Sequence, residues 1–111
     1  DKVGRAIIDF GLNVSFLKSS SKKINNPLNF TSKTKVTNLK NNKSYIGHTR
    51  NVLGNPINSL YWLINQLKEK NISLKKNFWV TTGSTTPIIP VKRGDIYRGV
   101  IPSLGKVLVK F

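Results

Sequence analysis

The stretch that begins at Asn55-Pro56 constrains the fold most, because it carries start, face and stop signals of one helix. Asn is a preferred N-cap residue, and Pro suits the first helical position. Apolar residues then recur at spacings of three and four, which predicts one buried stripe: Ile57, Leu60, Tyr61, Ile64 and Leu67. The helix dipole favours the positive charge of lysines in the last turn. Asn71 can end the helix because Asn tolerates the left-handed conformation. We therefore predict one major helix at about 56–70.

Short extended segments surround this helix. Residues 34–47 are typical of a hairpin turning at Asn41-Asn42, because Asn tolerates the positive φ of a tight primed turn. Further strands are predicted at 78–81, 96–100 and 106–111, the last with alternating apolar residues. Val80 is expected to lie buried with Leu60, Ile64 and Leu67. The fold class is therefore α+β, mainly antiparallel β with one major helix.

Two regions near the start of the chain are harder to assign from pattern. Residues 1–10 have the spacing of a helix that ends before Gly11. Residues 18–35 are polar and rich in Ser, Lys and Asn, which is typical of a loop. Because such a long loop rarely lacks all structure, part of it is expected to pair as an edge strand.

The length and composition of the chain limit the functions that it can have. A chain of 111 residues has room for one small domain, so 1–111 is expected to be a single domain. The absence of Cys excludes disulfides and thiolate chemistry, and one His with four acids leaves few groups for metal binding or acid–base catalysis. No apolar run reaches the length of a membrane span, so no membrane association and a cytoplasmic location are expected. The chain starts at Asp1 rather than Met, so we interpret it as a fragment of a longer protein.

The net charge of +15 raises the question of a nucleic-acid partner. Nineteen Lys and Arg residues face only four acids, but Lys dominates, whereas Arg is favoured for bidentate phosphate contacts. The lysines are scattered through turns and helix ends rather than forming a stripe with interleaved aromatics. Nucleic acid is therefore not the expected partner, and a non-enzymatic basic nucleic-acid-binding module remains an alternative.

Three places have the residue types of a site. Thr82-Gly83-Ser84-Thr85 is a hydroxyl-rich loop after an apolar segment, so its N–H and O–H groups could hold an anion such as a carboxylate, although an ordinary polar turn has the same composition. His48 has no carboxylate nearby in sequence to orient it, which favours a structural role. Asp95 is expected to fix a turn through its own backbone, and Asp9 lies near the predicted end of a helix, where the dipole disfavours it.

The second half of the chain resembles the C-terminal part of the 2-keto-4-pentenoate hydratase family, within the fumarylacetoacetate hydrolase superfamily. The matching motifs occur in family order: Val52-Leu53-Gly54-Asn55-Pro56, Leu60-Tyr61-Trp62-Leu63, Asn65-Gln66-Leu67, Trp79-Val80-Thr81-Thr82-Gly83-Ser84, Pro90-Val91-Lys92-Arg93-Gly94-Asp95 and Leu104-Gly105-Lys106-Val107 with Phe111. The match is weak over residues 1–51, where Ile8-Asp9 and Asn42-Lys43 with Gly47 are the only similar groups.

The resemblance implies a curved antiparallel sheet and addition of water to a 2-hydroxy-dienoate or 2-oxo-enoate in the catabolism of aromatic compounds. It implies Mg²⁺ or Mn²⁺ as cofactor, with the metal ligands and the catalytic residues upstream of this chain. The substrate, a small 2-oxo acid, would bind through its carboxylate to Gly83 and Ser84, with Thr82 and Thr85 beside them. A homo-oligomer is expected.

The sequence also departs from the family. Phe10-Gly11-Leu12-Asn13 stands where the family has Ala-Ser-Ser, so a polar pocket contact is missing unless Asn13 or Ser15 replaces it. Glu69 matches no ligand position. This chain alone is therefore expected to be inactive and to bind Mg²⁺ only weakly. A 4-oxalocrotonate-type decarboxylase of the same fold is the alternative enzyme.

Overall fold

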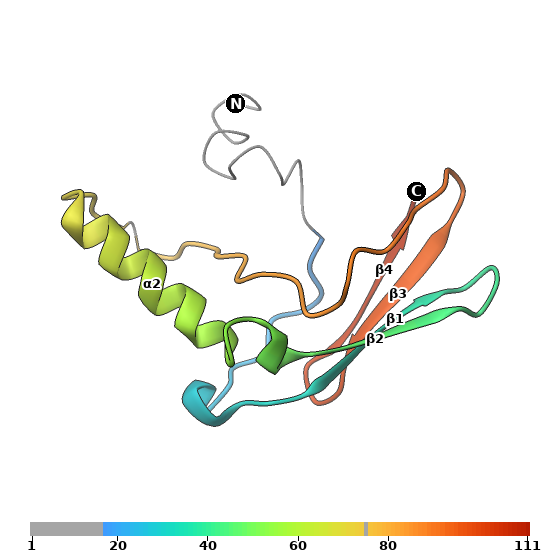
Figure 1. Ribbon diagram of the computed structural model, residues 1–111, viewed down its shortest axis with the longest axis horizontal. Helices are drawn as coiled ribbons and strands as arrows, with labels where there is room; N and C mark the ends of the chain where they lie inside the picture. Colours follow the sequence, from blue (N-terminus) through green and yellow to red (C-terminus); the bar gives the residue numbers. More distant parts are fainter. Residues whose placement is uncertain (1–16, 75) are drawn as a thin grey trace.

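The computed structural model describes residues 17–74 and 76–111. The described chain begins with an extended segment and the 3-10 turn η1 (Pro27–Asn29). The hairpin strands β1 (Lys33–Asn38) and β2 (Ser44–His48) follow, and the 3-10 turn η2 (Thr49–Asn51) leads into the helix α2 (Pro56–Glu69). After a long connection come β3 (Ile96–Ile101) and β4 (Gly105–Lys110). The predicted α+β class is confirmed at this level, as one four-stranded antiparallel sheet with one α-helix (Figure 1).

The strand order in the sheet is β2-β1-β3-β4, so each hairpin places one strand in the centre and one at an edge. The centre joins the two hairpins, with Val36 opposite Gly99 and Thr37 opposite Arg98. The predicted strands at 34–47, 96–100 and 106–111 are confirmed within one or two residues. In the loop at 18–35, the described strand begins only at Lys33, and it lies at the centre of the sheet rather than at its edge.

The helix α2 begins at the predicted Pro56 and ends at Glu69, one residue before the predicted end. The Asn55 side chain accepts a hydrogen bond from the Ile57 N–H at 2.9 Å, and Pro56 occupies the first helical position. At the other end, Asn71 adopts φ 55°, and the Asn71 and Ile72 N–H groups bond the carbonyls of Lys68 and Leu67. This pattern is a Schellman motif, which a residue in the left-handed conformation makes possible. The capping residues therefore set both ends of α2.

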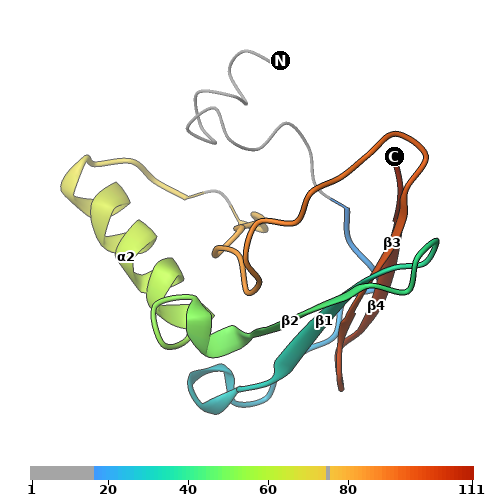
Figure 2. The same cartoon turned by 45° about the vertical axis from the view of Figure 1, so that its right-hand side comes forward.

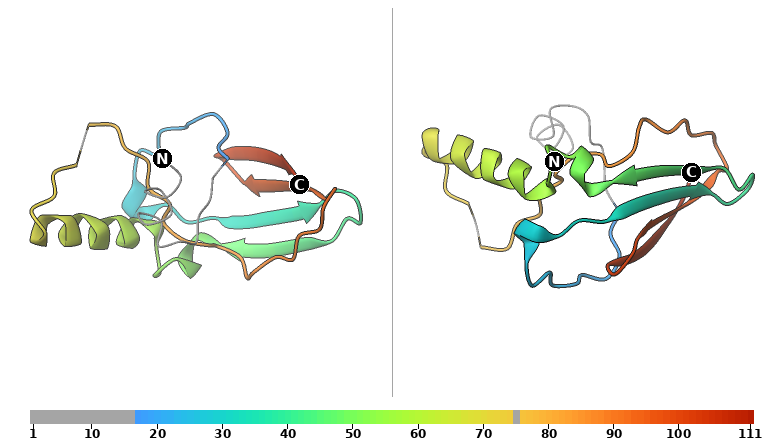
Figure 3. Two further views of the ribbon diagram at one scale, coloured as in Figure 1. Left: turned by 90° about the horizontal axis from the view of Figure 1, so that it is seen from above. Right: turned by 60° about the horizontal axis from the view of Figure 1, so that its bottom comes forward.

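Burial around α2 differs from the prediction. No residue of α2 is fully buried, and Leu60, Ile64, Leu67 and Val80 are each half-buried. The predicted joint burial of these residues is therefore wrong. The helix extends beyond the sheet rather than lying across it, so the described sheet does not cover its apolar stripe (Figure 3). Among the described residues, no helix is long and apolar enough to cross a membrane.

Two local predictions are also corrected. Residues 78–81 do not form a strand, because the sheet has no neighbour paired with them. The β1–β2 connection is longer than a two-residue primed turn. The Asn42 N–H bonds the Asn38 carbonyl at 2.8 Å, and only Asn42, not Asn41, has positive φ. The side chains of Asn38 and Asn41 accept the Lys40 and Lys43 N–H groups, which stabilises the wider loop.

The best-packed region lies where the 77–95 segment returns to the sheet. In Figure 2, this segment runs through the space between α2 and the sheet. Tyr97 on β3 is only 5% exposed, its ring packs edge-on against Phe111 at 6.1 Å, and its hydroxyl donates to the Pro90 carbonyl at 2.7 Å. Val52, also 5% exposed, lies between η2 and α2. These two residues are the buried apolar core of the described chain.

Candidate functional site

The loop Thr82-Gly83-Ser84-Thr85 is held against the β1–β2 hairpin by its last residue. The Thr85 carbonyl accepts two hydrogen bonds, from the His48 N–H at 3.1 Å and from Asn51 Nδ2 at 2.9 Å. The Thr85 hydroxyl bonds the hydroxyl of the buried Thr34 at 2.8 Å. Thr85 is therefore an anchor of the loop, and its carbonyl and hydroxyl are already bonded to protein partners.

Glycine is required where the loop meets the hairpin. A Cβ on Gly47 would overlap both the Thr85 carbonyl and the Thr34 hydroxyl, so only glycine lets the loop approach β2 this closely. Gly83 has φ +135°, and a Cβ there would come within 3.1 Å of a Val52 methyl group. The loop thus rests on the hairpin at one end and on the buried Val52 in its middle.

Gly83 and Ser84 are the exposed part of this loop, whereas Thr82 and Thr85 are half-buried. The contacts hold the loop at Thr85 and at Gly83, while Gly83 and Ser84 stay exposed to solvent. An exposed hydroxyl beside a glycine can donate to an anion that approaches the backbone. The part of the loop suited to hold a carboxylate is therefore Gly83-Ser84.

A groove of about 700 Å³ lies next to the loop, over one face of the sheet. Its apolar lining includes Val36, Val100 and Val107, and Trp79 lies at its side with Lys18 Nζ 5.0 Å from the ring centre. Thr85 lines the groove, but Thr82, Gly83 and Ser84 do not. The structure therefore brings the four predicted residues together as one loop, but only Thr85 reaches this groove.

The other candidate residues have structural contacts. His48 Nδ1 accepts the Arg50 N–H at 3.1 Å, so this nitrogen caps η2 and its lone pair is occupied. The Asp95 carboxylate accepts the Lys92 N–H at 2.9 Å, and the Asp95 N–H bonds the Lys92 carbonyl. The structural roles predicted for His48 and Asp95 are confirmed. Asp9, Asn13, Ser15 and the helix predicted at 1–10 lie outside the described residues.

Within residues 17–74 and 76–111, no three His, Asp or Glu side chains come together where they could hold a metal ion. The acids in this part of the chain are Glu69, at the end of α2, and Asp95, in the turn before β3. What the loop Thr82–Thr85 can do chemically is donate hydrogen bonds from its N–H and hydroxyl groups.

Sequence reasoning missed the residues that position the loop. Thr34, Gly47 and Asn51 lie far from Thr85 in sequence, and each has an ordinary local explanation in a strand or a turn. The only available signal was Gly47, since glycine inside a strand marks a close approach of another backbone.

Among models of known protein families, none matches this chain.

Proposed function

We propose that this chain forms the carboxylate-binding wall of a hydratase that acts on a small 2-oxo acid. The proposal combines the order of the sequence motifs with one structural observation. Two motifs that are about thirty residues apart in sequence meet in space, because Val52 packs under Gly83 and Asn51 donates to Thr85. These contacts join the segment leading into Leu53-Gly54-Asn55-Pro56 to the hydroxyl-rich loop.

The chemistry of the loop supports this role. A 2-oxo acid ends in a carboxylate, which neutral donors can hold without adding a further formal charge. Ser84 supplies an exposed hydroxyl, and Gly83 permits close approach to the backbone. The anchoring hydrogen bonds of Thr85 hold the loop in place before the ligand arrives, which lowers the cost of ordering it on binding.

Addition of water also needs groups that the described residues do not supply. We expect the ligands of Mg²⁺ or Mn²⁺ and the catalytic residues to come from outside the described residues. Such a cation, when bound, would act as a Lewis acid on the 2-oxo group. The role of this chain would be to hold the carboxylate end of the substrate.

The test compares two serine substitutions in the longest natural chain that contains these residues, supplied with Mg²⁺. Ser84→Ala should lower kcat/KM for hydration of a 2-hydroxy-dienoate by roughly ten- to a hundredfold, because it removes a hydrogen bond to a charged group. Gly83→Val should lower it further by steric exclusion. Ser73→Ala, in the exposed loop after α2, is the matched control and should have no effect. If both loop variants kept wild-type kinetics, the loop would be an ordinary turn that does not bind the substrate.

The same assay separates the alternative functions. A decarboxylase would release CO₂ from its substrate, and hydration would not. A basic binding module would turn over neither compound, and it would bind polyanions with an affinity that falls steeply with salt.

A further inference from the structure

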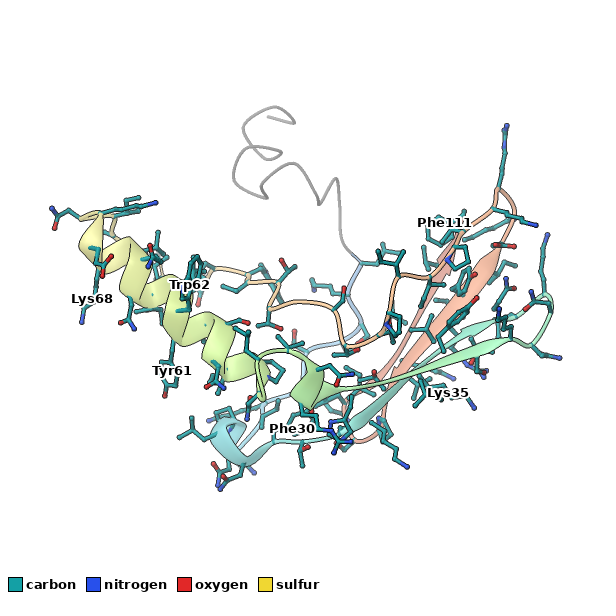
Figure 4. The ribbon with its side chains drawn as sticks, viewed as in Figure 1. Phe30, Lys35, Tyr61, Trp62, Lys68 and Phe111 are labelled. Carbon is teal, nitrogen blue, oxygen red and sulfur yellow. The ribbon has the colours of Figure 1, made fainter. Side chains whose placement is uncertain are left out.

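The two faces of the four-stranded sheet differ in charge. Residues opposite each other in a ladder share a face, so the registers assign every strand residue to one side. The face that contacts the 77–95 segment, through Thr34, Gly47 and Tyr97, carries no charged residue of the four described strands. The opposite face, which we call the basic face, carries all the charged strand residues, and every one is basic and exposed: Lys33, Lys35, Arg98, Lys106 and Lys110. Figure 4 shows Lys35 on the side of the sheet away from the 77–95 segment.

Four of these cations form a regular line. The registers place Lys35, Arg98 and Lys110 on a diagonal across β1, β3 and β4, each one strand over and two residues further along the sheet. Strands are about 4.8 Å apart and two residues span about 6.8 Å, so each diagonal step is about 8 Å. Lys33 extends the line by about 7 Å along β1. We call Lys33, Lys35, Arg98 and Lys110 the cationic track.

We propose that the cationic track binds the sugar–phosphate backbone of a nucleic acid strand, with one phosphate at each cation. Successive phosphates of one strand lie about 7 Å apart, since a duplex rises about 3.4 Å per nucleotide while it turns. The steps of the track match this repeat, and flexible lysine stems can take up the remaining difference. The lysines are scattered in sequence, and the strand order β2-β1-β3-β4 brings these four basic residues together.

The other residues of the basic face indicate how the strand would be held. Among the strand residues that the structure describes, none on this face is aromatic, so bases have no ring to stack on. The contacts would then be to phosphates, which carry no sequence information. We therefore expect binding that does not depend on the base sequence.

An anionic membrane fits this face less well. Its exposed large aliphatic residues are Ile46 and Leu108, which are 60% and 56% exposed. Ile46 lies on the edge strand β2 and Leu108 on the opposite edge strand β4, so they are about 16 Å apart with the track between them. Two isolated residues do not form the contiguous apolar patch that insertion into lipid would need.

This inference is independent of the proposed hydratase function. The Thr82–Thr85 loop contacts the hairpin from the other face of the sheet, through Thr34 and Gly47. Four phosphate contacts with a single strand contribute a slope of about −3 to the logarithm of affinity against the logarithm of salt concentration. The affinity should therefore fall roughly fiftyfold between 50 and 200 mM salt.

The test measures fluorescence anisotropy of a labelled 20-nucleotide oligothymidylate with the longest natural chain that contains these residues. The track variant combines Lys35→Gln, Arg98→Gln and Lys110→Gln. It should bind at least tenfold more weakly than wild type, and its salt slope should be smaller by about 2. The matched control removes the same charge from exposed residues at and after the end of α2, away from the sheet (Figure 4), and should weaken binding less than threefold: Lys68→Gln, Lys70→Gln and Lys76→Gln.

Two further measurements separate the net charge, the fold and other partners. Equal weakening in the track and control variants would mean that the net charge of +15 alone attracts the oligonucleotide, and the proposal would be wrong. If circular dichroism shows that the track variant is unfolded, the single Lys35→Gln variant replaces it and should lower the slope by about 0.7. Polyglutamate of equal charge, or phosphatidylserine vesicles, should bind more weakly than the oligonucleotide and should not distinguish track from control. A track-dependent preference for either of them would overturn the proposal in favour of an acidic protein or a membrane.

Discussion

The sheet and the connection between α2 and β3, residues 70–95, contain similar apolar residues but are held in different ways. In the sheet, each strand has a neighbour, and a regular ladder of hydrogen bonds joins the two. In the connection, Phe78, Trp79 and Ile88 are exposed, and its described residues form no strand. A β-rich composition is therefore not sufficient for a strand, because the strand also needs a partner edge.

The connection is instead positioned at a few points. Thr85 makes two hydrogen bonds with the hairpin and one with Asn51 in η2, and Pro90 accepts one from the buried Tyr97. The candidate site lies in this connection, so its geometry depends on a few hydrogen bonds and on the contact of Gly83 with Val52 rather than on a strand ladder. Substitutions at these points should move the loop while the sheet keeps its ladders.

The largest effect is expected from Gly47→Ala. The new side chain would collide with the Thr85 carbonyl and with the Thr34 hydroxyl, so the loop must leave the hairpin or β2 must shift. We expect a loss of about 3 kcal/mol in the free energy of unfolding, at the upper end for overpacked sites. Urea denaturation followed by circular dichroism would measure it.

Gly99→Ala is the matched control for this substitution. Gly99 also lies within a strand, but a Cβ there would meet only the Val107 side chain, at 3.4 Å. Its cost should stay below about 1 kcal/mol, because this distance is close to an ordinary contact. Equal costs at Gly47 and Gly99 would mean that glycine is needed for the strand rather than for the loop.

A smaller effect is expected from Thr85→Val. This change leaves the hydroxyl of the buried Thr34 without its partner at 2.8 Å, so we expect a loss of about 1.5 kcal/mol. The double variant Thr34→Val with Thr85→Val removes both hydroxyls and should recover most of this loss. Strictly additive losses in the double-mutant cycle would contradict the role of this pair as the anchor.

The sequence predicted the features that depend on neighbouring residues. Both caps of α2, the turn at Asp95 and the strands with alternating apolar residues were found because their signals lie within a few residues. The strand at 78–81 and the buried helix stripe were wrong, because each depends on a partner surface that pattern alone does not provide. For the same reason, the loop at Thr82–Thr85 could be predicted but its anchors Thr34 and Asn51 could not.

The helix cap allows a further test of how independent α2 is from the sheet. Asn55 makes two kinds of contact, since Oδ1 accepts from Ile57 and Nδ2 donates to the Leu28 carbonyl at 2.9 Å. Asn55→Ala should destabilise α2 by about 1 kcal/mol. Amide hydrogen exchange should accelerate in α2 and stay unchanged in the β1–β3 ladder, measured at low protein concentration.

Asn55→Asp separates the two contacts of this residue. The carboxylate still caps the helix and favours its dipole, but it cannot donate to Leu28. Exchange in α2 should therefore stay at the wild-type rate or slow, while the η1 turn at Pro27–Asn29 becomes less protected. Faster exchange in both α2 and the sheet in the Ala variant would indicate that they unfold as one unit.

The smallest effect is expected at the turn that leads from the connection into β3. The Asp95 carboxylate accepts the Lys92 N–H at 2.9 Å in a solvent-exposed setting, so the bond contributes little net free energy. Asp95→Ala should cost about 0.5 kcal/mol. Asp95→Asn retains an acceptor oxygen and should cost less than the Ala variant. Because the backbone bond from Gly94 to the Phe111 carbonyl, 2.7 Å long, also closes this turn, β3 should keep its register in both variants. A loss above about 2 kcal/mol in Asp95→Ala, measured by urea denaturation, would mean that a side-chain contact rather than the ladder sets where β3 begins.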